Sequence, residues 1–305
     1  MKITIVGTGR VGSAIAFALT LNPLADEVLL VNRSFAKAEG DAMDLRHASA
    51  LTNSSLQIRA GRVEDAAGSD VIVFTASAPL PDLGKGKSRQ DMAMGNMPIL
   101  NAWVPELAAG SPDAIIIMVT NPVDVMSFLT IELSGFPPER VIGTGTLVDS
   151  IRYRALLSEE LGIHAEDIRA YILGEHGDSQ FAAHSVAMTG GERFYPSDIS
   201  QRLFEQTVRM GYEVFRRKGH TCYGIALATV TIIDSIAYDL RHTMPVSVLV
   251  DGYLGIDDVC LSLPAVIGRR GVTRILHPTL AAEEQDAFRR CADTVRATLA
   301  SLKGS

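Results

Sequence analysis

Short apolar runs alternate with helical patterns through the first half of the chain. The runs at residues 3–6, 27–31, 71–75, 114–119 and 141–143 are apolar on both faces, which is typical of buried parallel strands. The segments between them are long enough for crossover helices. The pattern therefore predicts βαβ units and an α/β fold built on a doubly wound parallel sheet.

Helical periodicity accompanies these strands, with apolar positions three and four residues apart. Such segments occur at residues 11–21, 36–47 and 90–107, and we expect them to cover the sheet. After about residue 144 the alternation weakens. A helix is predicted at residues 148–161, then mixed strands and helices, and finally an amphipathic helix at residues 281–302.

This change of pattern predicts two domains in the chain. We place a doubly wound, Rossmann-type domain at residues 1–143 and a mixed α+β domain at residues 144–305. No flexible linker separates them, so we expect the domains to pack firmly, with the functional site in the cleft between them.

Composition restricts the possible functions. The 305 residues are 47% hydrophobic and 21% charged, a balance typical of a globular protein. The formal net charge of -7 argues against a nucleic-acid or membrane partner. Three cysteines without CxxC or zinc-type spacing predict neither disulfides nor a metal site. The strand-like start is too short for a signal or membrane segment, so a cytoplasmic protein is expected.

A glycine-rich turn follows the first predicted strand and opens the first predicted helix. Its residues Gly7, Gly9, Arg10, Val11 and Gly12 have GxGxxG spacing. The glycines permit a tight turn and a close approach of the backbone, while the helix amides face a pyrophosphate. We predict that this turn binds a dinucleotide.

The end of the second predicted strand reports on the choice of dinucleotide. An acidic residue there would hydrogen-bond the ribose 2′-hydroxyl and repel a 2′-phosphate. This chain has Asn32, Arg33 and Ser34 instead, and arginine matches phosphate geometry. We therefore favour NADP(H) over NAD(H). The alternative is that Arg33 is solvated, Asn32 belongs to a turn, and NAD(H) is still used.

Four separated segments carry further candidate chemistry: SRQD at residues 88–91, TNPV at 120–123, LVDSIR at 147–152 and GEHGDS at 174–179. In order and spacing they resemble the lactate/malate dehydrogenase family from end to end, together with the glycine turn. The runs KGHT at 218–221, LSLPA at 261–265 and GRRG at 268–271 also resemble that family. The resemblance implies an L-2-hydroxyacid dehydrogenase that forms a homodimer or homotetramer.

The resemblance also implies a role for each residue of the site. His176 would exchange a proton with the substrate oxygen, and Asp149 would orient its ring. Arg152 would hold the C1 carboxylate of the substrate. Arg89 would close over the substrate and polarise its carbonyl group. Asn121 would hydrogen-bond the reacting oxygen or the nicotinamide side of the cleft.

Substrate choice depends on the loop between Ala78 and Arg89. In the family an arginine in this loop marks dicarboxylate substrates, but here the loop is about three residues longer than usual. Counting from Ala78 reaches Leu80, and counting from Arg89 reaches Leu83; neither can pair with a second carboxylate. Thr221 also resembles lactate-type members. We predict a lactate/pyruvate-like substrate.

Three alternatives stay open. Lys85 or Lys87 could supply the missing positive charge, which would allow malate and oxaloacetate. The longer loop could instead enlarge the pocket for a branched 2-oxo acid. Finally, the chain could bind a dinucleotide without catalysing a reaction.

Overall fold

The computed structural model describes residues 1–22, 24–52, 54–79, 89–193 and 197–303 of the chain. Within these ranges, every helix is too short or too polar to cross a membrane.

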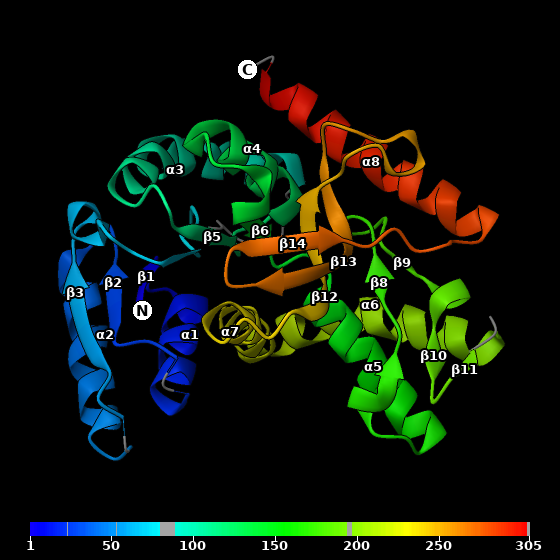
Figure 1. The fold of residues 1–305 in the computed structure, drawn as a ribbon, viewed down its shortest axis with the longest axis horizontal. Helices are drawn as coiled ribbons and strands as arrows, with labels where there is room; N and C mark the ends of the chain where they lie inside the picture. Colours follow the sequence, from blue (N-terminus) through cyan, green and yellow to red (C-terminus); the bar gives the residue numbers. More distant parts are fainter. Residues whose placement is uncertain (23, 53, 80–88, 194–196, 304–305) are drawn as a thin grey trace.

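A nine-stranded sheet runs through the molecule in the order β14-β13-β12-β6-β5-β4-β1-β2-β3 (Figure 1). Its parallel strands are β1 (Lys2–Val6), β2 (Glu27–Val31), β3 (Gln57–Gly61), β4 (Val71–Phe74), β5 (Ile115–Met118) and β6 (Val141–Gly143). Its antiparallel strands are β12 (His242–Leu249), β13 (Cys260–Gly268) and β14 (Gly271–Ile275). The predicted α/β class and the doubly wound parallel sheet are confirmed.

One strand of the parallel sheet, β3, was missed by the sequence interpretation. Gln57 is exposed and Arg59 half-buried, so the segment lacks the continuous apolar run by which the other strands were found. Its place at the edge of the sheet explains this composition, because an edge strand keeps one side and part of its faces in water.

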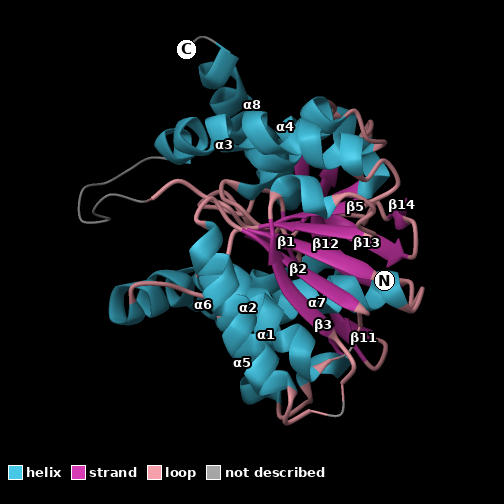
Figure 2. Cartoon of the chain, turned by 90° about the vertical axis from the view of Figure 1, so that its left-hand side faces the viewer, coloured by secondary structure: helices cyan, strands magenta, loops and turns pink. Residues whose placement is uncertain are grey.

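Helices cover both faces of the sheet: α3, α4 and α8 lie on one face, and α1, α2 and α7 on the other (Figure 2). The helices are α1 (Arg10–Leu21), α2 (Phe35–Ser49), α3 (Arg89–Gly110), α4 (Val123–Ser134), α5 (Leu147–Leu161), α6 (Asp198–Lys218), α7 (Tyr223–Ala237) and α8 (Ala282–Lys303). Helices α1, α2, α3, α5 and α8 are found where periodicity predicts them, with ends shifted by less than one turn.

Short elements complete the second half of the chain. Strands β7 (Ile168–Arg169), β10 (Met188–Thr189) and β11 (Glu192–Arg193) form a small sheet, and β8 (Ile172–Leu173) pairs with β9 (Phe181–Ala182). The 3-10 helices are η1 (Val63–Ala66), η2 (Pro138–Arg140), η3 (Ala165–Asp167), η4 (His184–Val186) and η5 (Tyr253–Gly255).

The two halves of the chain, which we expected to pack firmly against each other, share one sheet. Strand β12 joins β6 by pairing Ser247 with Gly143, so the second half extends the sheet of the first. One large hydrophobic core accordingly contains buried residues from both halves. A smaller core surrounds Tyr153 of α5 and Ile168 of β7. The boundary between residues 143 and 144 stays a prediction.

The turn before β14 offers a test of the packing between the two halves. Gly271 has φ +94°, and a Cβ atom there would lie 2.2 Å from the carbonyl oxygen of Glu139. Gly252 also has a positive φ, +70°, but nothing lies within 4 Å of its Cβ position. Gly252→Ala should therefore cost only the left-handed strain, about 1 kcal/mol. Gly271→Ala should cost about 2 kcal/mol more, because the backbone of η2 must move.

Equilibrium urea denaturation of both variants measures the two losses. Equal losses would show that the contact between Gly271 and η2 relaxes freely.

Candidate active site

The carboxyl ends of the central parallel strands meet at one edge of the sheet. Gly7 follows β1, Thr75 follows β4, and Asn121 follows β5. The hydroxyl of Thr75 donates a hydrogen bond to the carbonyl oxygen of Gly7 at 2.7 Å, which ties the first two ends together. In doubly wound sheets, ligands bind at this edge.

The glycine turn after β1 has the shape that a pyrophosphate requires. Gly7 has φ +98°, and a Cβ at Gly12 would lie 1.9 Å from the Gly7 carbonyl oxygen, so side chains are excluded at both positions. Gly9 is open on its Cβ side, and no side chain caps the first amides of α1. The described residues therefore fit the diphosphate of a dinucleotide.

Arg10 and Val11 complete the turn. The Arg10 guanidinium is exposed and donates a 3.3 Å hydrogen bond to the carbonyl oxygen of Gly219, just beyond α6. Val11 is half-buried against the core. Arg10 thus places a positive charge beside the phosphate site and connects it with the second half of the chain.

Asn32 follows β2 and takes part in the local turn. Its amide nitrogen donates to the hydroxyl of Thr8 at 2.8 Å, and its Oδ1 accepts from the backbone N–H of Ser34 at 3.1 Å. Arg33 and Ser34 are exposed beside it. This end of β2 therefore presents no carboxylate and one exposed guanidinium.

A histidine, a carboxylate and a guanidinium lie in contact at the same edge. His176 lies in the connection between β8 and β9, and its Nδ1 is 2.7 Å from Oδ2 of Asp149. The other oxygen of Asp149 accepts a 3.0 Å hydrogen bond from Arg152, three residues further along α5. The side chains of His176, Asp149 and Arg152 are 29%, 5% and 23% exposed. The structure thus brings three of the predicted site residues together.

The electrostatics of this pair favour a charged imidazole. Burial alone would lower the pKa of His176, but attraction and hydrogen bonding to Asp149 outweigh it, so the pKa of His176 is raised. Burial likewise opposes ionisation of Asp149, yet His176 and Arg152 hold the pKa of that carboxyl below its ordinary value. Asp149 therefore stays ionised at neutral pH and orients the ring through Nδ1.

Arg89 is the first residue of α3 and also reaches the site. Its guanidinium donates to the carbonyl oxygen of His176 at 2.7 Å, and its Nε lies 3.4 Å from Oε1 of Glu175. Glu175 is only 4% exposed and accepts a further hydrogen bond from the hydroxyl of Ser179. Glu175 belongs to the GEHGDS segment, for which only His176 had a predicted role.

Asn96 was missed by the sequence analysis. It is buried inside α3, where its Nδ2 donates to the carbonyl oxygen of Asn121 at 2.7 Å. Its Oδ1 accepts from the backbone N–H of Ala78, also at 2.7 Å. Asn96 therefore holds the end of β5 against the chain that follows β4, which leaves the exposed side chain of Asn121 at the edge of the sheet.

The predicted specificity residues are only partly described. Thr221 is half-buried in the segment between α6 and α7. Leu80, Leu83, Lys85 and Lys87 lie outside the described residues. Among the described residues, no group of histidine, cysteine, aspartate and glutamate side chains could hold a metal ion.

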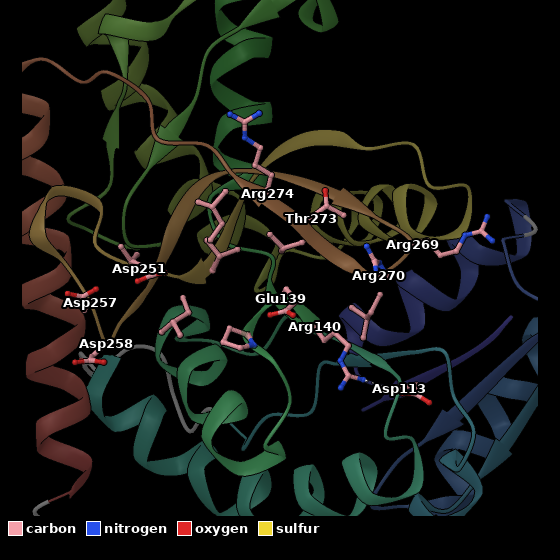
Figure 3. A pocket seen from close by; sticks show the side chains of 17 residues that line it. Asp113, Glu139, Arg140, Asp251, Asp257, Asp258, Arg269, Arg270, Thr273 and Arg274 are labelled. Carbon is pink, nitrogen blue, oxygen red and sulfur yellow. Dashed lines mark ion pairs between the residues drawn. The ribbon is translucent and has the colours of Figure 1, made fainter.

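A separate hollow of about 970 Å³ lies away from this site (Figure 3). Its lining includes Asp113 and Arg140, which precede β5 and β6, so it faces the opposite ends of the parallel strands. Arg270 and Arg274 contribute from the turn before β14 and from β14 itself. This hollow contains none of the predicted site residues.

A dinucleotide-type turn beside an imidazole–carboxylate pair and a guanidinium defines a nicotinamide-dependent dehydrogenase acting on a carboxylic acid. The family model described as "lactate/malate dehydrogenase, NAD binding domain" matches residues 1–143, and "lactate/malate dehydrogenase, alpha/beta C-terminal domain" matches residues 146–304. The chain belongs to the lactate/malate dehydrogenase family. It is a nicotinamide-dependent 2-hydroxyacid dehydrogenase.

Individual relatives agree with this membership over almost their whole length. The chain is 38% identical to the L-lactate dehydrogenase of Moorella thermoacetica, covering 99% of this chain and 97% of the relative. It is 36% identical to that of Acetivibrio thermocellus, with the same coverage of 99% and 97%. The crystal structure of minor L-lactate dehydrogenase from Enterococcus mundtii in the ligands-bound form superimposes with TM-score 0.93 at 31% identity, covering 98% of both chains.

The raised pKa of His176 predicts opposite pH profiles for the two directions of reaction. With His176 as the proton donor, reduction of a 2-oxo acid would need its protonated ring, and kcat/KM should fall as pH rises through the pKa of His176. Oxidation needs the neutral ring and should rise through the same range. Asp149→Asn removes the charge that raises this pKa, so both midpoints should move to lower pH.

Steady-state profiles in both directions provide the measurement. Asp293→Asn, which neutralises a carboxylate with 75% exposure on α8, is the control and should leave both midpoints unchanged. An unmoved midpoint in Asp149→Asn would remove Asp149 from this role.

Proposed function

We propose that the protein is a lactate-type L-2-hydroxyacid dehydrogenase that interconverts a pyruvate-like 2-oxo acid and its 2-hydroxy acid, with preference for NADP(H). One observation carries the proposal: His176, Asp149 and Arg152 form a continuous contact, with distances of 2.7 and 3.0 Å, at the sheet edge that holds the glycine turn. Similarity to proteins named L-lactate dehydrogenase supports the substrate class.

Each residue has a definite task in this reaction. The glycine turn would hold the diphosphate of the dinucleotide, whose nicotinamide would supply the hydride chemistry at C2 of the acid in either direction. His176 donates a proton from Nε2 to the carbonyl oxygen, because its Nδ1 is engaged by Asp149. The oxo acid thus gains a hydride and a proton, and the hydroxy acid loses both in reverse.

The two arginines bind and polarise the substrate. The Arg152 guanidinium has one nitrogen on Asp149 and presents its remaining donors to the C1 carboxylate. Arg89, which lies against the backbone of His176, places positive charge beside the oxygen on which negative charge develops. Asn121 offers an amide at the end of β5 for the reacting oxygen or the nicotinamide.

The preference for NADP(H) rests on the end of β2. The position that would carry an acidic residue in an NAD-selective site is Asn32, whose amide is held by Thr8 and Ser34. A 2′-phosphate would meet no carboxylate there, and the exposed Arg33 could pair with it.

The proposal includes assembly of identical chains in the cytoplasm. Helices α1 and α7 are neighbours (Figure 1), and both expose large apolar side chains. Phe17 is 50% exposed and Leu21 58% on α1, and on α7 Tyr223 is 71% and Leu227 58% exposed. A second copy of the chain would cover such a surface in a homodimer or a homotetramer. The three cysteines are buried and free, which suits a reducing compartment.

Steady-state rates with a panel of substrates test the specificity. We expect pyruvate to exceed oxaloacetate and a branched 2-oxo acid in kcat/KM, and NADPH to exceed NADH. Asn32→Asp should weaken NADPH by about tenfold or more, because a carboxylate would face the 2′-phosphate, while NADH affinity should hold or improve. NADPH binding equal to that of the wild type would refute the assignment of Asn32.

His176→Asn tests the proton transfer. Its kcat should fall by about a hundredfold or more, the usual scale of lost acid–base catalysis, while cofactor affinity stays near that of the wild type. His47→Asn, at an exposed position on α2, is the matched control and should keep full activity. A His176→Asn enzyme that turns over at the wild-type rate would exclude the mechanism.

A further inference from the structure

A second buried carboxylate lies behind His176. Asp124 is the second residue of α4 and is only 2% exposed. Its Oδ2 accepts a 2.7 Å hydrogen bond from the backbone N–H of His176, and its Oδ1 accepts a 2.6 Å hydrogen bond from the hydroxyl of Ser247 on β12. Asp124 therefore connects α4, the His176 turn and the second half of the sheet.

Asp124 differs from the other carboxylates around His176 in its partners. Asp149 pairs with Arg152, and Glu175 pairs with Arg89. Over the described ranges of the chain, no arginine or lysine forms an ion pair with Asp124. An unpaired buried carboxylate is costly, and an asparagine could make the same two hydrogen bonds without that cost. The negative charge itself therefore requires an explanation.

The balance of positive and negative charges in the site explains why a carboxylate occupies this position. When His176 is protonated, three cations (His176, Arg152 and Arg89) face three carboxylates (Asp149, Glu175 and Asp124). Asp149 is shared between His176 and Arg152, so the charge of Asp124 completes the balance. The thiols of Cys260 and Cys291 also lie nearby, but burial raises the pKa of both, that of Cys291 to about 11, so they stay neutral. The opposite charges of Glu175 and Arg89 largely cancel each other's effect on the His176 ring.

We propose that Asp124 is a positioning residue that fixes the backbone of His176 and adds a second negative charge, beside that of Asp149, which stabilises the protonated ring. The inference rests on the proposed dehydrogenase function and adds a residue that acts through His176 without touching the substrate. Strand β12, by which the second half extends the sheet, takes part through Ser247, which orients the Asp124 carboxylate.

The titration behaviour agrees with this geometry. Burial raises the pKa of Asp124 to about 6, although its hydrogen bonds to Ser247 and His176 act in the opposite direction. Asp124 therefore carries its charge above that pH. The raised pKa of His176 keeps the ring protonated above the ordinary histidine range, and Asp124 is among the charges that raise it.

Asp124→Asn separates the charge from the hydrogen bonds. The amide oxygen can still accept from the backbone of His176, and the amide nitrogen can donate to the hydroxyl of Ser247. We expect the pKa of His176 in the variant to fall by about half a unit to one unit, as the loss of a nearby charge predicts. Above the wild-type pKa of His176, kcat for reduction should fall by about threefold to tenfold, with KM for pyruvate within about twofold.

Two readouts test this without dependence on turnover alone. NMR titration of the imidazole ring gives the pKa of His176 directly, with its signal assigned by its absence from His176→Asn. The pH profile of reduction gives the same ionisation in the working enzyme. An unshifted NMR titration in a folded Asp124→Asn overturns the proposal, and so does a raised KM without a shift, which indicates a structural role only.

Ser247→Ala is the second variant. It keeps the carboxylate and its bond to His176 but removes one hydrogen-bond donor, so it should raise the pKa of Asp124. The pKa of His176 should then fall, as in Asp124→Asn, by a smaller amount. If circular dichroism shows that Asp124→Asn does not fold, this variant decides, and an unshifted His176 overturns the proposal. Absence of wild-type turnover with every 2-oxo acid would refute the proposed function, while the NMR shift would still test Asp124.

Discussion

The hydrogen bond between His176 and Asp149 is the interaction on which the site depends. It joins a turn between two short strands to the first turn of α5, across 27 residues of sequence. Its geometry places one ring nitrogen against a buried carboxylate, so the proposed proton exchange would use the other. Arg152 contacts Asp149, and Arg89 contacts the backbone of His176. The positions of both guanidinium groups therefore depend on this pair.

The continuous sheet keeps these partners in register. Gly174, just before the catalytic turn, pairs with Ser262 of β13 through backbone hydrogen bonds of 2.8 and 3.1 Å. The hydroxyl of Ser262 accepts from the backbone N–H of Thr146 at the start of α5. The same strand therefore fixes both segments that carry the histidine and its carboxylate. The antiparallel strands thus extend the sheet of the first half and position the site at the same time.

Sequence patterns predicted the features that depend on local order. Buried strands with two apolar faces, amphipathic helices and the glycine turn are all visible in short windows of sequence. The edge strand β3 was missed because the polar Gln57 and Arg59 interrupt its apolar run. Asn96, Asp124 and Glu175 were missed as site residues because their tasks depend on partners elsewhere in the chain, 52 residues away for Asp124 and His176. A polar residue within an amphipathic helix gives no local sign of such a partner.

Binding of the substrate should itself favour the protonation that reduction requires. The carboxylate of a 2-oxo acid brings one negative charge to Arg152, which lies 3.0 Å from Asp149. Sharing Arg152 with the substrate weakens its hold on Asp149, so more of the Asp149 charge is available to the imidazole 2.7 Å away. The charge of the substrate and the freed charge of Asp149 both add negative potential at the imidazole ring, so both raise the pKa of His176. A neutral substrate analogue would lack this effect, so in the proposed mechanism Arg152 would both anchor the acid and prepare His176 to donate its proton.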